Sequence, residues 1–107
     1  MRPVIAVTGT KREAAVLAGL GMTVIAGGGD AARLTSELAR LAKGAAGIIS
    51  FGMAGALDPT TKIGDWVIGT SLTGTWVGDC DPHLVDILDY CIPYAHFGAV
   101  YADGKLI

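Results

Sequence analysis

The sequence predicts an α/β fold built on a mostly parallel sheet. The first half of the chain alternates short apolar runs with segments of helical composition, in the order 3–7, 11–20, 22–26, 31–43 and 48–51. Strands and helices that alternate in this way form βαβ units, in which right-handed crossovers join parallel strands. The 107 residues are enough for one domain with its own core, so we predict a single domain over residues 1–107.

The first predicted helix has a capping signal. Thr10 precedes it, and Glu13 follows three residues later. This is the spacing of a capping box, in which the threonine hydroxyl accepts a backbone N–H and the glutamate reaches back to the cap. Glu13 therefore has a complete structural explanation, which stands beside a possible catalytic one. Gly19 and Gly21 are predicted to end the helix.

The second predicted helix is amphipathic. Asp30 is a natural N-cap, and Leu34, Leu38 and Leu41 recur at helical spacing, so that they share one face. Gly44 is predicted to close this helix before the chain enters the next strand.

The third predicted strand leads into a turn that contains two glycines. Residues 48–51 are an apolar run between Gly47 and Gly52, the pattern of a strand covered on both faces. Gly52 and Gly55 bracket the turn that follows. Glycines let main-chain N–H groups approach a ligand closely, but at the end of a strand they also serve as simple turn formers. These residues alone leave both interpretations open.

The second half of the chain has a weaker pattern. Residues 66–68 continue as a strand, and residues 70–81 are rich in Gly, Thr and Asp. A short helix is predicted over 82–90 and a strand over 95–101. His96 lies within this last apolar stretch, where a core or interface histidine is commoner than a catalytic one.

Composition limits the classes of partner. The net charge is -2, and Lys and Arg form no cluster beyond Lys11 and Arg12, which disfavours nucleic-acid binding. The apolar run at the amino terminus is too short to span a bilayer, so we predict no membrane span and a cytoplasmic location.

Charged residues make up 17% of the chain, against a usual share of about 25%. Such a chain has little polar material to cover its surface, which predicts a homo-oligomer or a missing part of the fold.

The cysteines and histidines of the sequence form no known metal or redox motif. Cys80 and Cys91 match neither a Cys-x-x-Cys motif nor a zinc pattern, so free thiols are predicted. The acidic residues near His83 repeat no known ligand spacing, and solvated charges explain them. We therefore predict no metal.

The segment from Ser50 to Pro59, followed by Gly64 and Asp65, resembles the nucleoside phosphorylase and nucleosidase superfamily. That family includes purine nucleoside phosphorylases and methylthioadenosine/S-adenosylhomocysteine nucleosidases. Its signature is a Gly-x-Ala-Gly-Gly/Ala-Leu turn followed by a Gly-Asp that opens the next strand. The Ser-Phe-Gly-x-Ala-Gly form is most similar to the hopanoid-associated phosphorylase branch.

The resemblance implies a three-layer α/β fold with a mixed, mostly parallel central sheet, of which this chain is an incomplete, amino-terminal portion. It implies cleavage of the N-glycosidic bond of a purine nucleoside-like substrate, an adenosyl compound such as an adenosyl-hopanoid, by phosphate or water. A small-molecule nucleoside is then the binding partner. No cofactor is implied, although phosphate can serve as co-substrate.

The resemblance also implies the first half of a site. Gly9 and Thr10 would line the pocket for phosphate or the attacking water. The wall beside ribose and base would be formed by the turn residues Gly52, Met53, Ala54 and Gly55.

Charged residues of the first loop complete this predicted site. Glu13 is the catalytic candidate, since it lies one position short of the nucleosidase glutamate that activates water, counted from Gly9. Met53 stands where many relatives have a phosphate-contacting Ser, and Ser50 stands where hexameric bacterial phosphorylases have an Arg. Arg12 is the candidate to supply that charge, although an exposed basic residue in a helix's first turn is commonly just solvated.

Two alternatives to an active enzyme follow from the sequence. The Met-Glu segment and the acidic Asp that family members carry in their second half have no counterpart here, so the chain could be a non-catalytic remnant that binds a ligand or a partner. A dinucleotide-binding module is suggested by Gly27 to Asp30 after a strand. However, Gly-x-Gly-x-x-Gly is not met there or at Gly9, so we rank it last.

Overall fold

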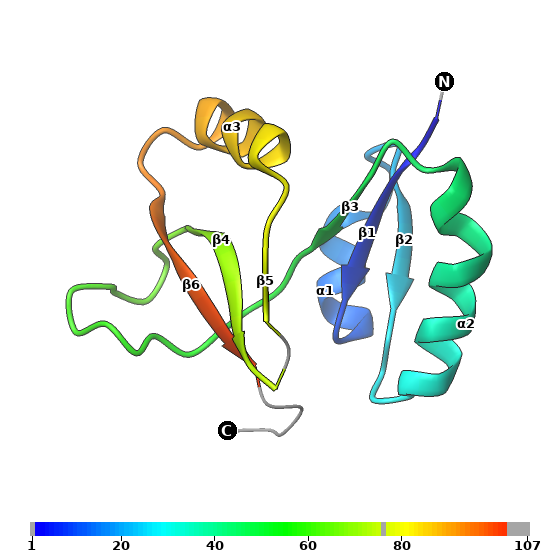
Figure 1. Cartoon of the computed structure of the whole chain (residues 1–107), viewed down its shortest axis with the longest axis horizontal. Helices are drawn as coiled ribbons and strands as arrows, with labels where there is room; N and C mark the ends of the chain where they lie inside the picture. Colours follow the sequence, from blue (N-terminus) through cyan, green and yellow to red (C-terminus); the bar gives the residue numbers. More distant parts are fainter. Residues whose placement is uncertain (1, 76, 103–107) are drawn as a thin grey trace. The chain divides into compact units, whose positions relative to one another are not determined.

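The computed structural model describes residues 2–75 and 77–102, which fall into two compact units divided between Ala54 and Gly55 (Figure 1). The first unit contains a three-stranded parallel sheet in the order β2-β1-β3. Its elements, in chain order, are β1 (Val4–Thr8), α1 (Lys11–Leu17), β2 (Thr23–Ala26), α2 (Ala31–Leu41), the 3₁₀ helix η1 (Ala42–Gly44) and β3 (Gly47–Ser50).

The two helices of the first unit flank its sheet from opposite sides (Figure 1). This follows from the strand order. The chain moves from β1 to β2 in one direction and from β2 back across to β3 in the other, so that right-handed crossovers place α1 and α2 on opposite faces. The predicted succession of strands and helices in residues 1–52 is thus confirmed.

The core of the first unit lies around its central strand. Ile5 is only 1% exposed, and Ala6, Leu17 and Ile25 are buried with it. Thr8 is also buried, and its hydroxyl donates to the carbonyl oxygen of Thr10 at 3.0 Å, so that this buried polar group has a partner.

The second unit has its own three-stranded sheet, in the order β5-β4-β6. Strands β4 and β6 are parallel, whereas β5 runs antiparallel to β4. Its elements are β4 (Val67–Gly74), β5 (Gly78–Asp79), α3 (Pro82–Cys91) and β6 (His96–Ala102). Among the described residues of the second unit, Ile68 of β4 is the buried hydrophobic residue.

The predicted fold class is confirmed, since both units are α/β and three of the four strand pairings in the described chain are parallel. The single domain over residues 1–107 stays a prediction. The longest described helix, α2, has 11 residues, about half of what crossing a bilayer requires, and no described helix could span a membrane.

Several element boundaries differ from the prediction. Helix α1 ends at Leu17 rather than residue 20, because Ala18 is extended and Gly19 and Gly21 take positive φ angles of 79° and 81°. Strand β3 is not covered on both faces: its residues alternate between partly buried and exposed, with Ile48 on the exposed side.

Candidate functional site

The candidate site lies at the carboxyl edge of the sheet in the first unit. Strands β1 and β3 are parallel neighbours, with Val7 opposite Ser50, and the Phe51 N–H extends the ladder by donating to the Val7 carbonyl at 2.9 Å. The loops that follow these strands, at Gly9 and at Gly52, therefore emerge at the same edge. In open α/β sheets, ligands bind outside the carboxyl ends of the strands.

The glycine-rich loop after β2 is joined to this edge. The Gly27 N–H donates to the Thr8 carbonyl at 2.8 Å, and the Gly28 N–H donates to the Gly9 carbonyl at 3.0 Å. Gly28 and Gly29 have positive φ angles, and Asp30 then caps α2 by accepting the Arg33 N–H. These glycines thus have a structural role, in turning the chain from β2 into α2.

Glu13 forms the predicted capping box. Its backbone N–H donates to the Thr10 hydroxyl at 3.1 Å, and its Oε1 accepts the Thr10 N–H at 3.0 Å. The Thr10 hydroxyl also lies 3.1 Å from the same Oε1. The local pattern Thr-x-x-Glu thereby fixes the position of one carboxylate oxygen at the start of α1.

The second oxygen of Glu13 reaches the loop after β3. Oε2 accepts the backbone N–H of Met53 at 2.8 Å, across 40 positions of sequence. Gly52 permits this approach, because a Cβ at that position would lie 2.7 Å from Oε2, closer than real Cβ atoms come. A Cβ at Gly9 would lie 3.4 Å from Oε1. The two loops thus close around the carboxylate.

These contacts keep Glu13 ionised. The Met53 N–H lowers the pKa of the Glu13 carboxyl below its ordinary value of 4.5, and the Thr10 hydroxyl and the N–H groups of Thr10 and Gly9 act in the same direction. Partial desolvation opposes them without reversing the shift. A carboxylate has about four lone-pair positions on its two oxygens. Oε2 has one recorded donor, the Met53 N–H, so it can accept a further hydrogen bond from a ligand.

The structure brings together five of the eight residues that the sequence singled out, namely Gly9, Thr10, Glu13, Gly52 and Met53. Ala54 ends the first unit and Gly55 begins the second, so Gly55 is not placed relative to Glu13. Arg12 is exposed, and within the described ranges no ion pair of its guanidinium is recorded. The Met53 side chain is 92% exposed.

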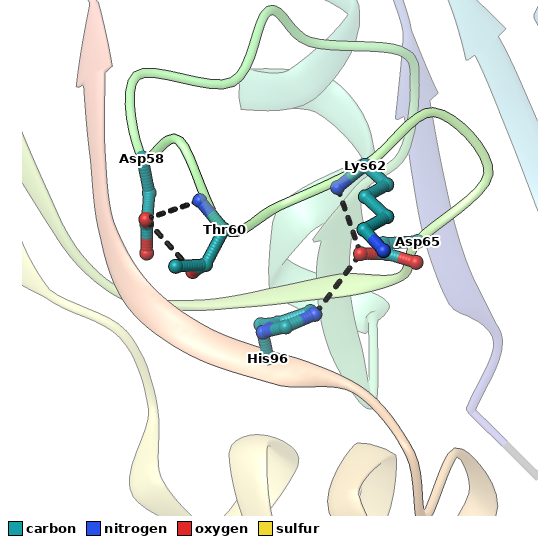
Figure 2. A network of polar contacts seen from close by, with 5 residues as sticks. All are labelled: Asp58, Thr60, Lys62, Asp65 and His96. Carbon is teal, nitrogen blue, oxygen red and sulfur yellow. Dashed lines mark hydrogen bonds and ion pairs between the residues drawn. The ribbon is translucent and has the colours of Figure 1, made fainter.

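Sequence reasoning missed a second polar cluster, which lies in the second unit (Figure 2). His96 Nε2 lies 3.1 Å from Asp65 Oδ2, and the same oxygen accepts the Lys62 N–H at 2.8 Å. Nearby, Asp58 Oδ1 accepts the N–H and the hydroxyl of Thr60. His96 was predicted to be a core or interface residue; its side chain is 44% exposed, so it is not a core residue, and the interface role stays a prediction. Since 31 positions separate Asp65 from His96, no local signal could have found the pair.

The described part of the chain offers few other reactive or metal-binding groups. Cys80 and Cys91 are exposed free thiols. No group of three or more His, Cys, Asp or Glu side chains comes together there in a way that could hold a metal ion.

Comparison with known proteins identifies the family. No curated protein and no solved structure matches the chain. The family profile described as "Phosphorylase superfamily" matches residues 2–107, nearly the whole sequence. The chain therefore belongs to the phosphorylase superfamily, which indicates cleavage of nucleoside glycosidic bonds as its general class of chemistry.

Proposed function

We propose that this protein cleaves the N-glycosidic bond of a purine nucleoside-like substrate and releases the base. The substrate that we propose is an adenosyl compound, with an adenosyl-hopanoid as the specific candidate. Support comes from family membership and from the turn Gly52 to Leu57, followed at family spacing by Gly64 and Asp65. With phosphate as the attacking group, the reaction is a glycosyl transfer to phosphate.

The observation that carries the proposal is the Glu13 carboxylate, held between two loops at the carboxyl edge of a parallel sheet. Glycosidic cleavage passes through a transition state with positive charge on the sugar ring. A nearby carboxylate that stays ionised stabilises that charge, and its pKa is lowered here by the Met53 N–H. In the reaction, an oxygen of water or phosphate bonds to C1′ while the C1′–N bond breaks and its electron pair leaves with the base.

We assign Glu13 the task of orienting the attacking group. A lowered pKa makes a carboxylate a weaker base, so proton abstraction is not its main contribution. The remaining acceptor position on Oε2 suits a water or a phosphate hydroxyl. Gly9 and Thr10 would line this position. Arg12, which lies two residues after Thr10, would contact phosphate.

The wall of the proposed pocket is the segment Gly52, Met53, Ala54 and Gly55. Glycines there let the ligand approach the main chain, and the exposed Met53 side chain offers apolar surface to the ribose or the base. No resident cofactor is proposed. A cytoplasmic location is also proposed, on the ground that the free thiols of Cys80 and Cys91 suit a reducing compartment.

The test is base release by the intact protein. Adenosine, methylthioadenosine and S-adenosylhomocysteine are each incubated with and without phosphate, and adenine is measured by chromatography. We expect adenine release, and the sugar product, free ribose or its 1-phosphate, identifies the attacking group. Glu13→Gln should lower the rate by about 10²-fold or more, the usual scale for loss of a group that stabilises transition-state charge.

Glu37→Gln is the matched control, since Glu37 lies on α2 and pairs with Arg40 on the exposed surface. The control should keep the wild-type rate. The proposal fails if none of the substrates releases its base in either arm, or if the two variants have equal rates.

A second candidate function is a non-catalytic association module that binds its ligand or partner without turnover, and forms a homo-oligomer. The observation that favours it is the number of large apolar side chains exposed in both units, which include Met53, Leu57, Ile63, Tyr90 and Tyr94. Sedimentation equilibrium distinguishes the cases. A concentration-dependent oligomer without base release supports the module, and a monomer contradicts it.

A further inference from the structure

The start of β6 is joined to the loop that precedes β4 by two hydrogen bonds from one residue. The backbone N–H of His96 donates to the Trp66 carbonyl at 2.8 Å, and its ring Nε2 lies 3.1 Å from Asp65 Oδ2 (Figure 2). The side chains of His96 and Asp65 are 44% and 33% exposed. His96 thus holds both the backbone and a side chain of the loop's last residues.

Asp65 also closes the turn from which it projects. Its N–H donates to the Lys62 carbonyl at 3.0 Å, and its Oδ2 accepts the Lys62 N–H at 2.8 Å. Gly64, at the third position of this four-residue turn, has φ +92°, the geometry of a type II turn. One carboxylate oxygen therefore links the turn 62–65 to the first residue of β6.

Apolar burial does not hold this loop in place. Leu57 is 81% exposed and Ile63 is fully exposed, whereas polar contacts recur along the segment. At the other end, Asp58 binds the N–H and hydroxyl of Thr60, and the Thr61 N–H donates to the Asp58 carbonyl at 3.1 Å. Segments with few buried apolar contacts open locally at low free-energy cost. The position of the loop thus depends on its polar contacts.

We propose that Asp65 and His96 form a latch that positions the loop 57–66 within the second unit. His96 is then a positioning residue for this loop, because its ring holds Asp65 and its backbone holds Trp66.

The contacts of Asp65 favour its ionised form, which is the acceptor in the latch. The pKa of Asp65 is lowered chiefly by the Lys62 N–H, and that of Asp58 chiefly by the Thr60 N–H, with His96 adding to both shifts. The Asp65 carboxylate is therefore available to accept from both Lys62 and His96.

Limited trypsin digestion of the full chain tests the latch without any assay of activity. Lys62 is exposed within the loop, and Lys43, exposed in η1 of the first unit, supplies an internal reference. The ratio of cleavage after Lys62 to cleavage after Lys43 reports opening of the loop. His96→Leu should raise this ratio about two- to fivefold, the scale of an exposed ion pair. His96→Gln, which keeps an N–H donor, should raise it less.

His83→Leu is the matched control, because His83 is an exposed histidine of α3 that has no recorded contact with Asp65. It should leave the ratio unchanged. An unchanged ratio in His96→Leu overturns the latch.

Discussion

At the scale of single residues, Glu13 connects two parts of the first unit. One oxygen serves the helix cap at Thr10 and the other accepts the Met53 N–H. Gly52 lies directly beside this second contact, since a Cβ there would come within 2.7 Å of Oε2. The glycine and the carboxylate therefore depend on each other, and a test at Gly52 reports on Glu13.

Gly52→Ala should displace the Glu13 carboxylate from Met53. The carboxylate is the far end of a flexible side chain, so it can move away from the new methyl group, but its hydrogen bond to the Met53 N–H is then lost. Because that N–H is the main cause of the lowered pKa, the pKa of Glu13 should rise toward 4.5. Carboxyl chemical shifts followed through an acid titration measure this.

Gly44→Ala is the control for this substitution. A Cβ at Gly44 meets nothing within 4 Å, and Gly44 lies in the same unit. The pKa of Glu13 should be the same in this variant as in the wild type. A Glu13 pKa that Gly52→Ala leaves unchanged would show that the Met53 contact does not form in solution.

At the scale of elements, α1 depends on its cap. It has seven residues, and isolated helices shorter than about 12 residues are marginal in water. Leu17 supplies its buried contact, and the capping box at Thr10 satisfies N–H groups of its first turn. The position of Glu13 therefore depends on a helix with little stability of its own.

Thr10→Ala should lower the free energy of unfolding by about 1 kcal/mol, the usual cost of removing a threonine N-cap. Urea denaturation followed by circular dichroism measures the change. Thr35→Ala is the matched control: Thr35 lies inside α2, exposed, with its hydroxyl donating to the Ala31 carbonyl at 2.8 Å. Since alanine is the better helix former, the control should be neutral or slightly stabilising. Equal losses in the two variants would contradict the cap assignment.

Most elements were predictable from local sequence. A comparison of α2 with β4 shows which kind of element is predictable and which is not. Asp30 and the leucines of α2 specified the start of that helix correctly, because capping and amphipathic spacing are local properties. The predicted end was wrong: α2 stops at Leu41 rather than residue 43, and Ala42–Gly44 form a 3₁₀ helix. The later part of β4 was not recognised, since residues 70–74 are rich in Gly, Ser and Thr. Pairing with β5 and β6 forms this strand, and no local pattern reports such pairing.

At the scale of the whole molecule, each unit has a small core, and polar contacts at loops supplement it. The carboxyl groups of Glu13, Asp58 and Asp65 all have lowered pKa values, each mainly because of a backbone N–H. Glu13 belongs to the first unit, and Asp58 and Asp65 belong to the second. Acid should therefore weaken both units by the same mechanism.

The dependence of stability on pH follows from the sign of these shifts. A folded-state pKa below the ordinary value means that the unfolded chain binds protons more readily. The contribution of these groups is complete above their ordinary values, 4.5 for Glu13 and 3.8 for the aspartates, and is lost as the pH falls through the lower folded-state values.

Thermal melts recorded from pH 6 to 3 should thus show a midpoint that falls below about pH 4.5. In Glu13→Gln the fall should be shallower, because one of the three groups no longer titrates. A wild-type midpoint that rises on acidification would contradict the assigned shifts.

The sequence by itself determined the α/β class, the parallel strands of the first unit, the capping box at Thr10 and Glu13, and the superfamily. These features rest on short-range patterns, namely alternation, spacing and a contiguous motif, which any compact fold of the chain must respect.

The tertiary structure alone decided what those residues contact. Glu13 meets Met53 because parallel pairing of β1 and β3 brings their following loops to one edge, and His96 meets Asp65 because β6 begins beside the start of β4, directly after Asp65 and Trp66. Gly52 could be a turn former or part of a site until the carboxylate beside it was located. Contacts across 40 and 31 positions depend on strand order and register, which local sequence does not encode.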